Sequence, residues 1–228
     1  MIVTFDLFSA LIDSRSGGVA AFNRIAVARG WTVSGSELYD AWDAANKAAQ
    51  ARAAHDLAVE GAPWTSFREL STRALERAYD ELGLDADPAA DLDTIAASVA
   101  DWPLWPDVAD GLAALRLDHR LGILSNVDDA LFATTRAASL VDDALVLTSE
   151  RLRAYKPGPE IYRRAVDRTG GHVHVAASAR DVRGSLESGL PTVRVARPGH
   201  RVDREGPMPG QVVESVGDLG DVLARFGT

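Results

Sequence analysis

The residues of this chain that could do chemistry stand just beyond short apolar stretches or in a loop that contains proline and glycine. They combine two carboxylates, two hydroxyls, one amide and one ammonium group: Asp6, Ser125, Asn126, Lys156, Ser178 and Asp181. A carboxylate can act as a covalent nucleophile, and a neighbouring ammonium group favours its ionised form. Hydroxyl and amide groups at a helix N-terminus can bind an anion. If the fold brings these groups into one pocket, they could attack an electrophilic, anionic substrate.

Asp6 has two interpretations from its own surroundings. Residues 2–4 are β-branched and residue 5 is aromatic, which predicts a buried strand. Ligands of open α/β sheets bind beyond the carboxyl ends of the strands, so a carboxylate in that position would be displayed toward a ligand. Asp is also a common cap of turns and helix starts. The local sequence leaves both interpretations open.

From residue 102 onward, short apolar runs alternate with helical segments. Strands are predicted at residues 121–124, 145–147, 172–176, 192–195 and 211–213. Helices are predicted between them at residues 106–116, 128–138, 159–168 and 181–188. This alternation is typical of right-handed βαβ units and predicts an α/β fold, a Rossmann-like parallel sheet with helices on both faces. The loops that carry the six polar residues would then meet at one edge of the sheet.

The segment between the first strand and this sheet looks almost wholly helical. Helices are predicted at residues 19–29, 37–59, 66–82 and 89–99, because none of these segments alternates as a strand does. Residues 14–18, Ser-Arg-Ser-Gly-Gly, predict a loop or hinge before them. We therefore expect an all-helical cap subdomain over residues 15–98, inserted into a catalytic core of residues 1–14 and 99–228.

The composition narrows the class of protein. The chain has 228 residues, 46% of them hydrophobic, with a net charge of −9 and no cysteine, which excludes disulfides, thiolate metal sites and a Cys nucleophile. An acidic chain repels nucleic-acid backbones, so we expect no nucleic-acid partner. Without a basic leader or a bilayer-spanning apolar run, we expect no membrane contact and a cytoplasmic location. The expected partner is a small anionic substrate, and a homodimer stays open.

Four segments, in this order, are similar to the four motifs of the haloacid dehalogenase-like hydrolase superfamily. They are residues 5–11 (FDLFSAL), 124–126 (LSN), 156–162 (KPGPEIY) and 175–184 (VAASARDVRG). The match covers essentially the whole predicted core, whereas the predicted cap is only loosely similar. The chain therefore resembles members of this superfamily that carry a helical cap after the first motif.

This resemblance implies a role for each polar residue. Asp6 would be the nucleophile and form a covalent ester or acyl phosphate that water then cleaves. Lys156 would keep Asp6 ionised and reduce its repulsion of an anionic substrate. Ser125 and the backbone amide of Asn126 would bind the anionic group of the substrate, with a helix N-terminus behind them. Asp181 would orient Lys156 or the hydrolytic water.

Within the superfamily the pattern is closest to the 2-haloacid dehalogenases. Phosphatases carry a second Asp two residues after the nucleophile as a general acid, whereas this chain has Phe8, and halide needs no proton to leave. The Gly-Asp pair that helps phosphatases hold Mg²⁺ is replaced by Ala176 and Ala177. Tyr162 and Ser178 match substrate-pocket positions of the dehalogenases. The resemblance therefore implies no cofactor, with Mg²⁺ expected only for a phosphatase.

Two departures from the dehalogenase pattern keep alternatives open. Asp43 stands where those enzymes place a cap arginine that grips the substrate and the departing halide, so Lys47 or Arg15 would have to substitute. Ala10 replaces a threonine near the nucleophile. Three functions remain: metal-independent dehalogenation of a small 2-haloacid, which we favour, a divergent Mg²⁺-dependent phosphatase, and a non-catalytic member that binds a small anion or a protein partner.

Overall fold

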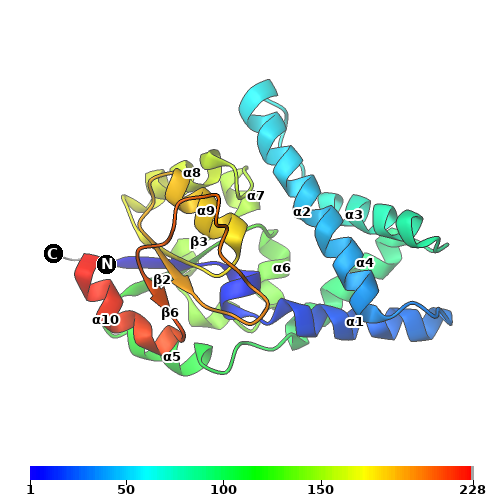
Figure 1. Ribbon diagram of the computed structural model, residues 1–228, viewed down its shortest axis with the longest axis horizontal. Helices are drawn as coiled ribbons and strands as arrows, with labels where there is room; N and C mark the ends of the chain where they lie inside the picture. Colours follow the sequence, from blue (N-terminus) through cyan, green and yellow to red (C-terminus); the bar gives the residue numbers. More distant parts are fainter. Residues whose placement is uncertain (227–228) are drawn as a thin grey trace.

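Six parallel strands form the sheet in this computed structural model, which describes residues 1–226, and their order is β3-β2-β1-β4-β5-β6 (Figure 1). The strands are β1 (Ile2–Phe5), β2 (Arg120–Ser125), β3 (Val146–Thr148), β4 (Val173–Ala176), β5 (Thr192–Val195) and β6 (Val212–Val213). β1 lies in the middle, because the chain adds β2 and β3 on one side of it and β4 to β6 on the other. Such a reversal of strand order opens a crevice at the carboxyl ends of the strands, which is where Asp6 stands.

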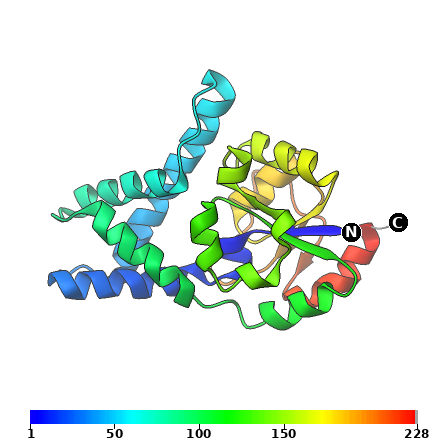
Figure 2. The ribbon, with the colours of Figure 1, turned by 180° about the vertical axis from the view of Figure 1, so that it is seen from behind.

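Helices cover both faces of this sheet, as the α/β pattern predicted. α8 (Pro159–Thr169) and α9 (Ala179–Glu187) lie over one face, and α5 (Val108–Leu115) and α10 (Leu219–Leu223) lie over the other (Figures 1 and 2). The shorter helices α6 (Asp129–Thr134) and α7 (Ser149–Leu152) follow β2 and β3. The buried residues of the central strands, such as Val3, Phe5 and Ile123, have no exposed surface and form the core between these layers.

Four helices project from the sheet as a separate layer and form the cap (Figures 1 and 2). They are α1 (Ser14–Arg29), α2 (Gly35–Glu60), α3 (Phe67–Leu82) and α4 (Pro88–Ser98), and α2 packs against both α1 and α3. α2 begins with a capping box between Ser34 and Glu37 and ends at Gly61 in the left-handed conformation. The predicted α/β core with an inserted all-helical cap is therefore confirmed.

The predicted loop at residues 14–18 is wrong, because this segment is the first turn of α1. The Asp13 carboxylate caps the helix by accepting a hydrogen bond from the Ser16 amide. Gly17 and Gly18 lie inside the helix, at positions where neighbouring aromatic rings leave no room for a Cβ. A Cβ on Gly17 would lie 2.3 Å from Cγ of Trp102, and one on Gly18 would lie 2.4 Å from Cε2 of Tyr39. These glycines therefore allow close packing in a helix rather than marking a turn.

Other element boundaries differ only at their ends. The helix predicted at 128–138 ends at Thr134, and the helix predicted at 106–116 begins at Val108. A π-helical turn, η1 (Leu7–Leu11), directly follows β1 and was not predicted. None of the helices within residues 1–226 is both long and apolar enough to cross a bilayer.

Candidate active site

Asp6 ends the central strand and faces both the π-helical turn and the other polar loops. Its Oδ2 accepts hydrogen bonds from the amide of Ser9, at 3.2 Å, and from the Ser9 hydroxyl. Its Oδ1 lies 2.7 Å from Nζ of Lys156 and 3.5 Å from Oγ of Ser125. The two interpretations of Asp6 are thus compatible, because the same carboxylate caps η1 and lines a cleft.

Lys156 joins the two carboxylates of the predicted site. Its Nζ donates to Oδ1 of Asp6 at 2.7 Å, to Oδ2 of Asp181 at 2.6 Å and to the carbonyl of Leu124 at 2.8 Å. Burial by itself would lower the pKa of Lys156, but the two carboxylates outweigh it and raise the pKa above its usual value. The ammonium group therefore stays protonated and uses all of its donors within the protein.

Asp181 is held by three donors and is almost fully buried. Oδ2 accepts from Lys156 and lies 3.2 Å from Nε2 of His174, while Oδ1 accepts from the hydroxyl of Tyr162 at 2.8 Å. Burial would raise the pKa of Asp181, but Lys156 and His174 keep it well below the usual range. A carboxylate with so low a pKa is a poor base for water. This geometry therefore favours the expected role of orienting Lys156.

Ser125 is the last residue of β2 and Asn126 follows it, and their side chains have different surroundings. Ser125 is buried beside Asp6. The Asn126 side chain holds the Lys156 backbone from both sides, donating to its carbonyl at 2.9 Å and accepting from its amide at 2.8 Å. It also donates to Gln50 of α2 at 2.8 Å, which links the core to the cap. Asn126 thus positions the loop of Lys156.

Two backbone amides at the helix start behind Asn126 already have partners within the protein. The Val127 amide donates to the Ser149 hydroxyl at 3.0 Å, and the Asp129 amide donates to the Glu150 carboxylate at 2.7 Å. The carboxylate of Asp128 caps α3 from the same place, accepting from two amides of the cap. The Glu150 carboxylate therefore already binds one amide at the N-terminal end of α6, and anion binding by the Asn126 amide stays a prediction.

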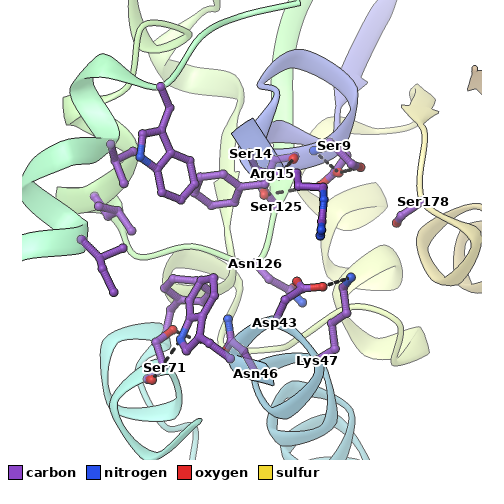
Figure 3. Close-up of a pocket in the computed structure, with 18 of the residues that line it drawn as sticks. Ser9, Ser14, Arg15, Asp43, Asn46, Lys47, Ser71, Ser125, Asn126 and Ser178 are labelled. Carbon is purple, nitrogen blue, oxygen red and sulfur yellow. Dashed lines mark hydrogen bonds and ion pairs between the residues drawn. The ribbon is translucent and has the colours of Figure 1, made fainter. Parts of the chain in front are cut away.

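A cleft of about 880 Å³ lies between the core and the cap, and it gives access to Asp6. Figure 3 shows Ser9 and Ser125 from the core facing Asp43, Asn46 and Lys47 of α2 across this cleft. Of the predicted substrate-binding residues, five line it: Phe8, Arg15, Lys47, Asn126 and Ser178.

Tyr162 does not line the cleft, which corrects its expected contact with substrate. Its ring is buried behind Asp181, with the hydroxyl on that carboxylate. Burial and the negative charge of Asp181 raise the pKa of Tyr162 well above its usual value, so the hydroxyl keeps its proton. Tyr162 therefore acts on the site through Asp181.

The two cap cations expected to grip the substrate are engaged with neighbouring carboxylates. Lys47 Nζ lies 2.5 Å from Oδ2 of Asp43, the residue in the expected arginine position (Figure 3). The Arg15 guanidinium donates to both carboxylate oxygens of Asp40 and to the hydroxyl of Ser36. Each positive charge is thereby balanced within the cap.

Three lining or supporting residues were not among the predicted site residues. Ser9 binds Asp6, His174 binds Asp181, and Arg180 lines the cleft beside Asp181. His174 could have been suspected, because it lies in β4, the strand next to β1, where it pairs with Thr4. The Thr4 hydroxyl lies 3.0 Å from Nδ1 of His174. Arg180 stood inside the fourth motif but gave no signal that it faces a cleft.

A match to a family model identifies the family of this chain. Residues 1–178 match the model of the haloacid dehalogenase-like hydrolases. The chain belongs to the haloacid dehalogenase-like hydrolase family. It is therefore a hydrolase, and the predicted resemblance is confirmed.

Similar haloacid dehalogenase-like hydrolases include several 2-haloacid dehalogenases. The (S)-2-haloacid dehalogenase 4A of Burkholderia cepacia is 31% identical over 170 residues, which cover 71% of this chain and 73% of that protein. The crystal structure of the L-2-haloacid dehalogenase PA0810 is 28% identical, with a TM-score of 0.78 and 98% of each chain covered. The defluorinating L-2-haloacid dehalogenase Rha0230 is 26% identical, with a TM-score of 0.81 and coverage of 98% and 94%.

The side chains of this haloacid dehalogenase-like hydrolase do not fit the Mg²⁺ of a phosphatase. The Lys156 ammonium group lies between Asp6 and Asp181, where a divalent cation would need both carboxylates. Within residues 1–226, no group of three His, Asp or Glu side chains could hold a metal ion. Mg²⁺ prefers several oxygen ligands in octahedral geometry, which this pair with its own cation does not supply.

Proposed function

We propose that this hydrolase cleaves the carbon–halogen bond of a small 2-haloacid without a metal ion, through an ester on Asp6. The observation that carries the proposal is Phe8, an apolar wall of the cleft where a phosphatase would need an acid. The Phe8 ring stacks on Phe67 with the centroids 6.4 Å apart and meets Trp102 edge-on at 6.0 Å. Halide leaves without a proton, so this wall suits its departure.

In the first step a carboxylate oxygen of Asp6 attacks the carbon that bears the halogen. The new carbon–oxygen bond forms as the carbon–halogen bond breaks, and the halide leaves with the bonding electron pair. Lys156 keeps Asp6 ionised before the attack, because its ammonium group lies 2.7 Å from Oδ1. Displacement from the rear inverts the carbon, so an (S)-2-haloacid would give an (R)-2-hydroxy acid.

In the second step water attacks the carboxyl carbon of Asp6 and breaks the ester. The Lys156 ammonium group and the Ser9 amide bond the two oxygens of this carboxyl group, so they can stabilise the negative charge of the tetrahedral intermediate. The hydroxy acid leaves with an oxygen that came from Asp6, and water replaces that oxygen. One proton of the water ends on the hydroxyl oxygen of the departing hydroxy acid, and the other passes to solvent through the open cleft.

Halide release in the presence of a chelator tests the proposal. Wild-type protein with EDTA should release chloride from (S)-2-chloropropionate, and Asp6→Asn should abolish this release. Asp110→Asn is the matched control, because Asp110 is exposed on α5 outside the cleft. Phosphate release from a phosphate ester that requires Mg²⁺, together with no halide release from any 2-haloacid, would overturn the proposal.

A further inference from the structure

Five strongly basic side chains line the cleft, and four of them form an ion pair. Arg15 pairs with Asp40, Lys47 with Asp43, Arg68 with Asp93, and Lys156 with Asp6 and Asp181. Within residues 1–226, Arg180 is the one strongly basic side chain of the cleft that has no carboxylate within ion-pair distance. It is therefore the cation of the cleft with charge left for a ligand.

Arg180 is held in place by two neutral groups rather than by an anion. One terminal nitrogen donates to the carbonyl of Lys156 at 2.9 Å, and the other lies 3.4 Å from the carbonyl of Lys47 in α2. A guanidinium group has more N–H donors than these two bonds use. Burial lowers the pKa of Arg180 below its usual value, and the nearby carboxylates do not fully offset this effect. An anion that entered the cleft would relieve the cost of this uncompensated charge.

Two other groups near this cleft that could bind an anion already have partners within the protein. The Asp129 amide of α6 already donates to the Glu150 carboxylate, and Lys47 is balanced by Asp43, which stands where related dehalogenases carry an arginine. The Lys47–Asp43 pair is neutral as a whole, so it offers no net positive charge to an anionic substrate that approaches along α2. A substrate carboxylate therefore needs a cation from another element of the fold.

We propose that Arg180, at the start of α9, is the cation that grips the carboxylate of the substrate, and this rests on the proposed function. Its planar guanidinium group can bind a carboxylate through two parallel hydrogen bonds. Arg180 precedes Asp181 and donates a hydrogen bond to the Lys156 carbonyl. It therefore holds the substrate beside Lys156 and Asp181, close to the nucleophile. The core thus supplies a positive charge for the substrate, because Arg15 and Lys47 of the cap are paired with carboxylates.

Binding of propionate, a substrate analogue without a halogen, tests this proposal apart from catalysis. Calorimetry on wild-type protein should detect propionate binding, and Arg180→Met should weaken it by at least about 10-fold, since hydrogen bonds to charged groups are involved. Arg180→Lys should recover part of the affinity. Lys47→Met and Arg15→Met should change it less than about 3-fold, because those cations are already paired. Arg183→Met is the matched control on the same helix, because Arg183 does not line the cleft and is paired with Glu187 and Asp203.

Neutral propionamide separates a charge contact from a structural one. Arg180 also links α9 to the cap through Lys47, and loss of that link would weaken the acid and the amide equally. Charge recognition predicts that Arg180→Met weakens propionate and leaves propionamide unchanged. Equal weakening of both, no weakening of propionate, no binding of propionate to wild-type protein, or a larger effect in Lys47→Met or Arg15→Met would overturn the proposal.

The KM for a 2-haloacid distinguishes this proposal from the proposed function. If wild-type protein releases halide and Arg180→Met leaves KM unchanged, the Arg180 proposal fails and the dehalogenase function stands. If no 2-haloacid yields halide but propionate binding still depends on Arg180, the anion site stands and the dehalogenase function fails.

Discussion

Replacing Lys156 with methionine should destabilise the protein and also stop its reaction. The ammonium group balances Asp6 and Asp181, whose side chains are 11% and 3% exposed. In the Met variant two buried carboxylates face each other without a cation. Removing one partner of a buried ion pair costs about 3–5 kcal/mol in the free energy of unfolding. We expect a loss of this size at pH 8.

The loss should depend on pH in a defined direction. In the wild type the native pKa of Asp181 is lowered, so its stabilising effect is complete above the unfolded pKa of about 3.9 and disappears only as pH falls through the native pKa. In the variant, burial and the like charge of Asp6 raise the pKa of the carboxylate pair. Protonation then relieves the repulsion as pH falls. The difference in the free energy of unfolding between variant and wild type should therefore be smaller at pH 5 than at pH 8.

Urea unfolding of Lys156→Met and Lys47→Met at pH 8 and pH 5 checks this prediction. These are the two lysines of the chain. The Lys47 side chain is 48% exposed, and its ion-pair partner Asp43 lies one helical turn before it. Such exposed pairs contribute about 0.2–1 kcal/mol. Equal losses of stability in the two variants, or a Lys156→Met loss that grows toward pH 5, would contradict this prediction.

Three further variants test the groups behind the cleft. Tyr162→Phe should lower kcat for halide release and leave KM unchanged, because the hydroxyl bonds Asp181 and the ring does not line the cleft; a raised KM would contradict this. His174→Phe should cost about 1–3 kcal/mol in urea unfolding, because it removes a buried partner of both Asp181 and Thr4; an unchanged midpoint would count against that contact. Burial lowers the pKa of His172 to about 3. Between pH values of about 3 and about 6.5, His172 is therefore protonated in the unfolded chain only, and the free energy of unfolding falls as pH falls. His172→Leu should make this decline shallower by up to about 1.4 kcal/mol per pH unit in unfolding measurements, and an identical slope would refute the assignment.

The strand ends could be predicted from the sequence because two signals agreed there. Apolar runs alternated with helical segments, which indicated parallel strands, and the carboxyl ends of parallel strands share one edge. Asp6, Ser125 and Asp181 each follow such a run, and the structure brings them together around Lys156. The inserted helical cap was equally clear, since none of its segments alternated.

The contacts of individual side chains could not be predicted, because they depend on packing between distant elements. Gly17 and Gly18 looked like a hinge, but the rings packed on α1 explain them. Tyr162 matched a substrate-pocket position, but α8 places its ring behind Asp181. Arg180 has no local signal of its role, since a sequence does not reveal which cations lack a carboxylate partner.

A single turnover in heavy-oxygen water tests the covalent role of Asp6 most directly. Enzyme in excess over (S)-2-chloropropionate is quenched after one turnover, and the peptide that carries Asp6 is fragmented in a mass spectrometer. We predict one heavy oxygen in the Asp6 carboxylate and ordinary oxygen in the hydroxyl group of the product. Heavy oxygen in the product with an unlabelled Asp6 would mean that water attacks the substrate directly and that no ester forms on Asp6.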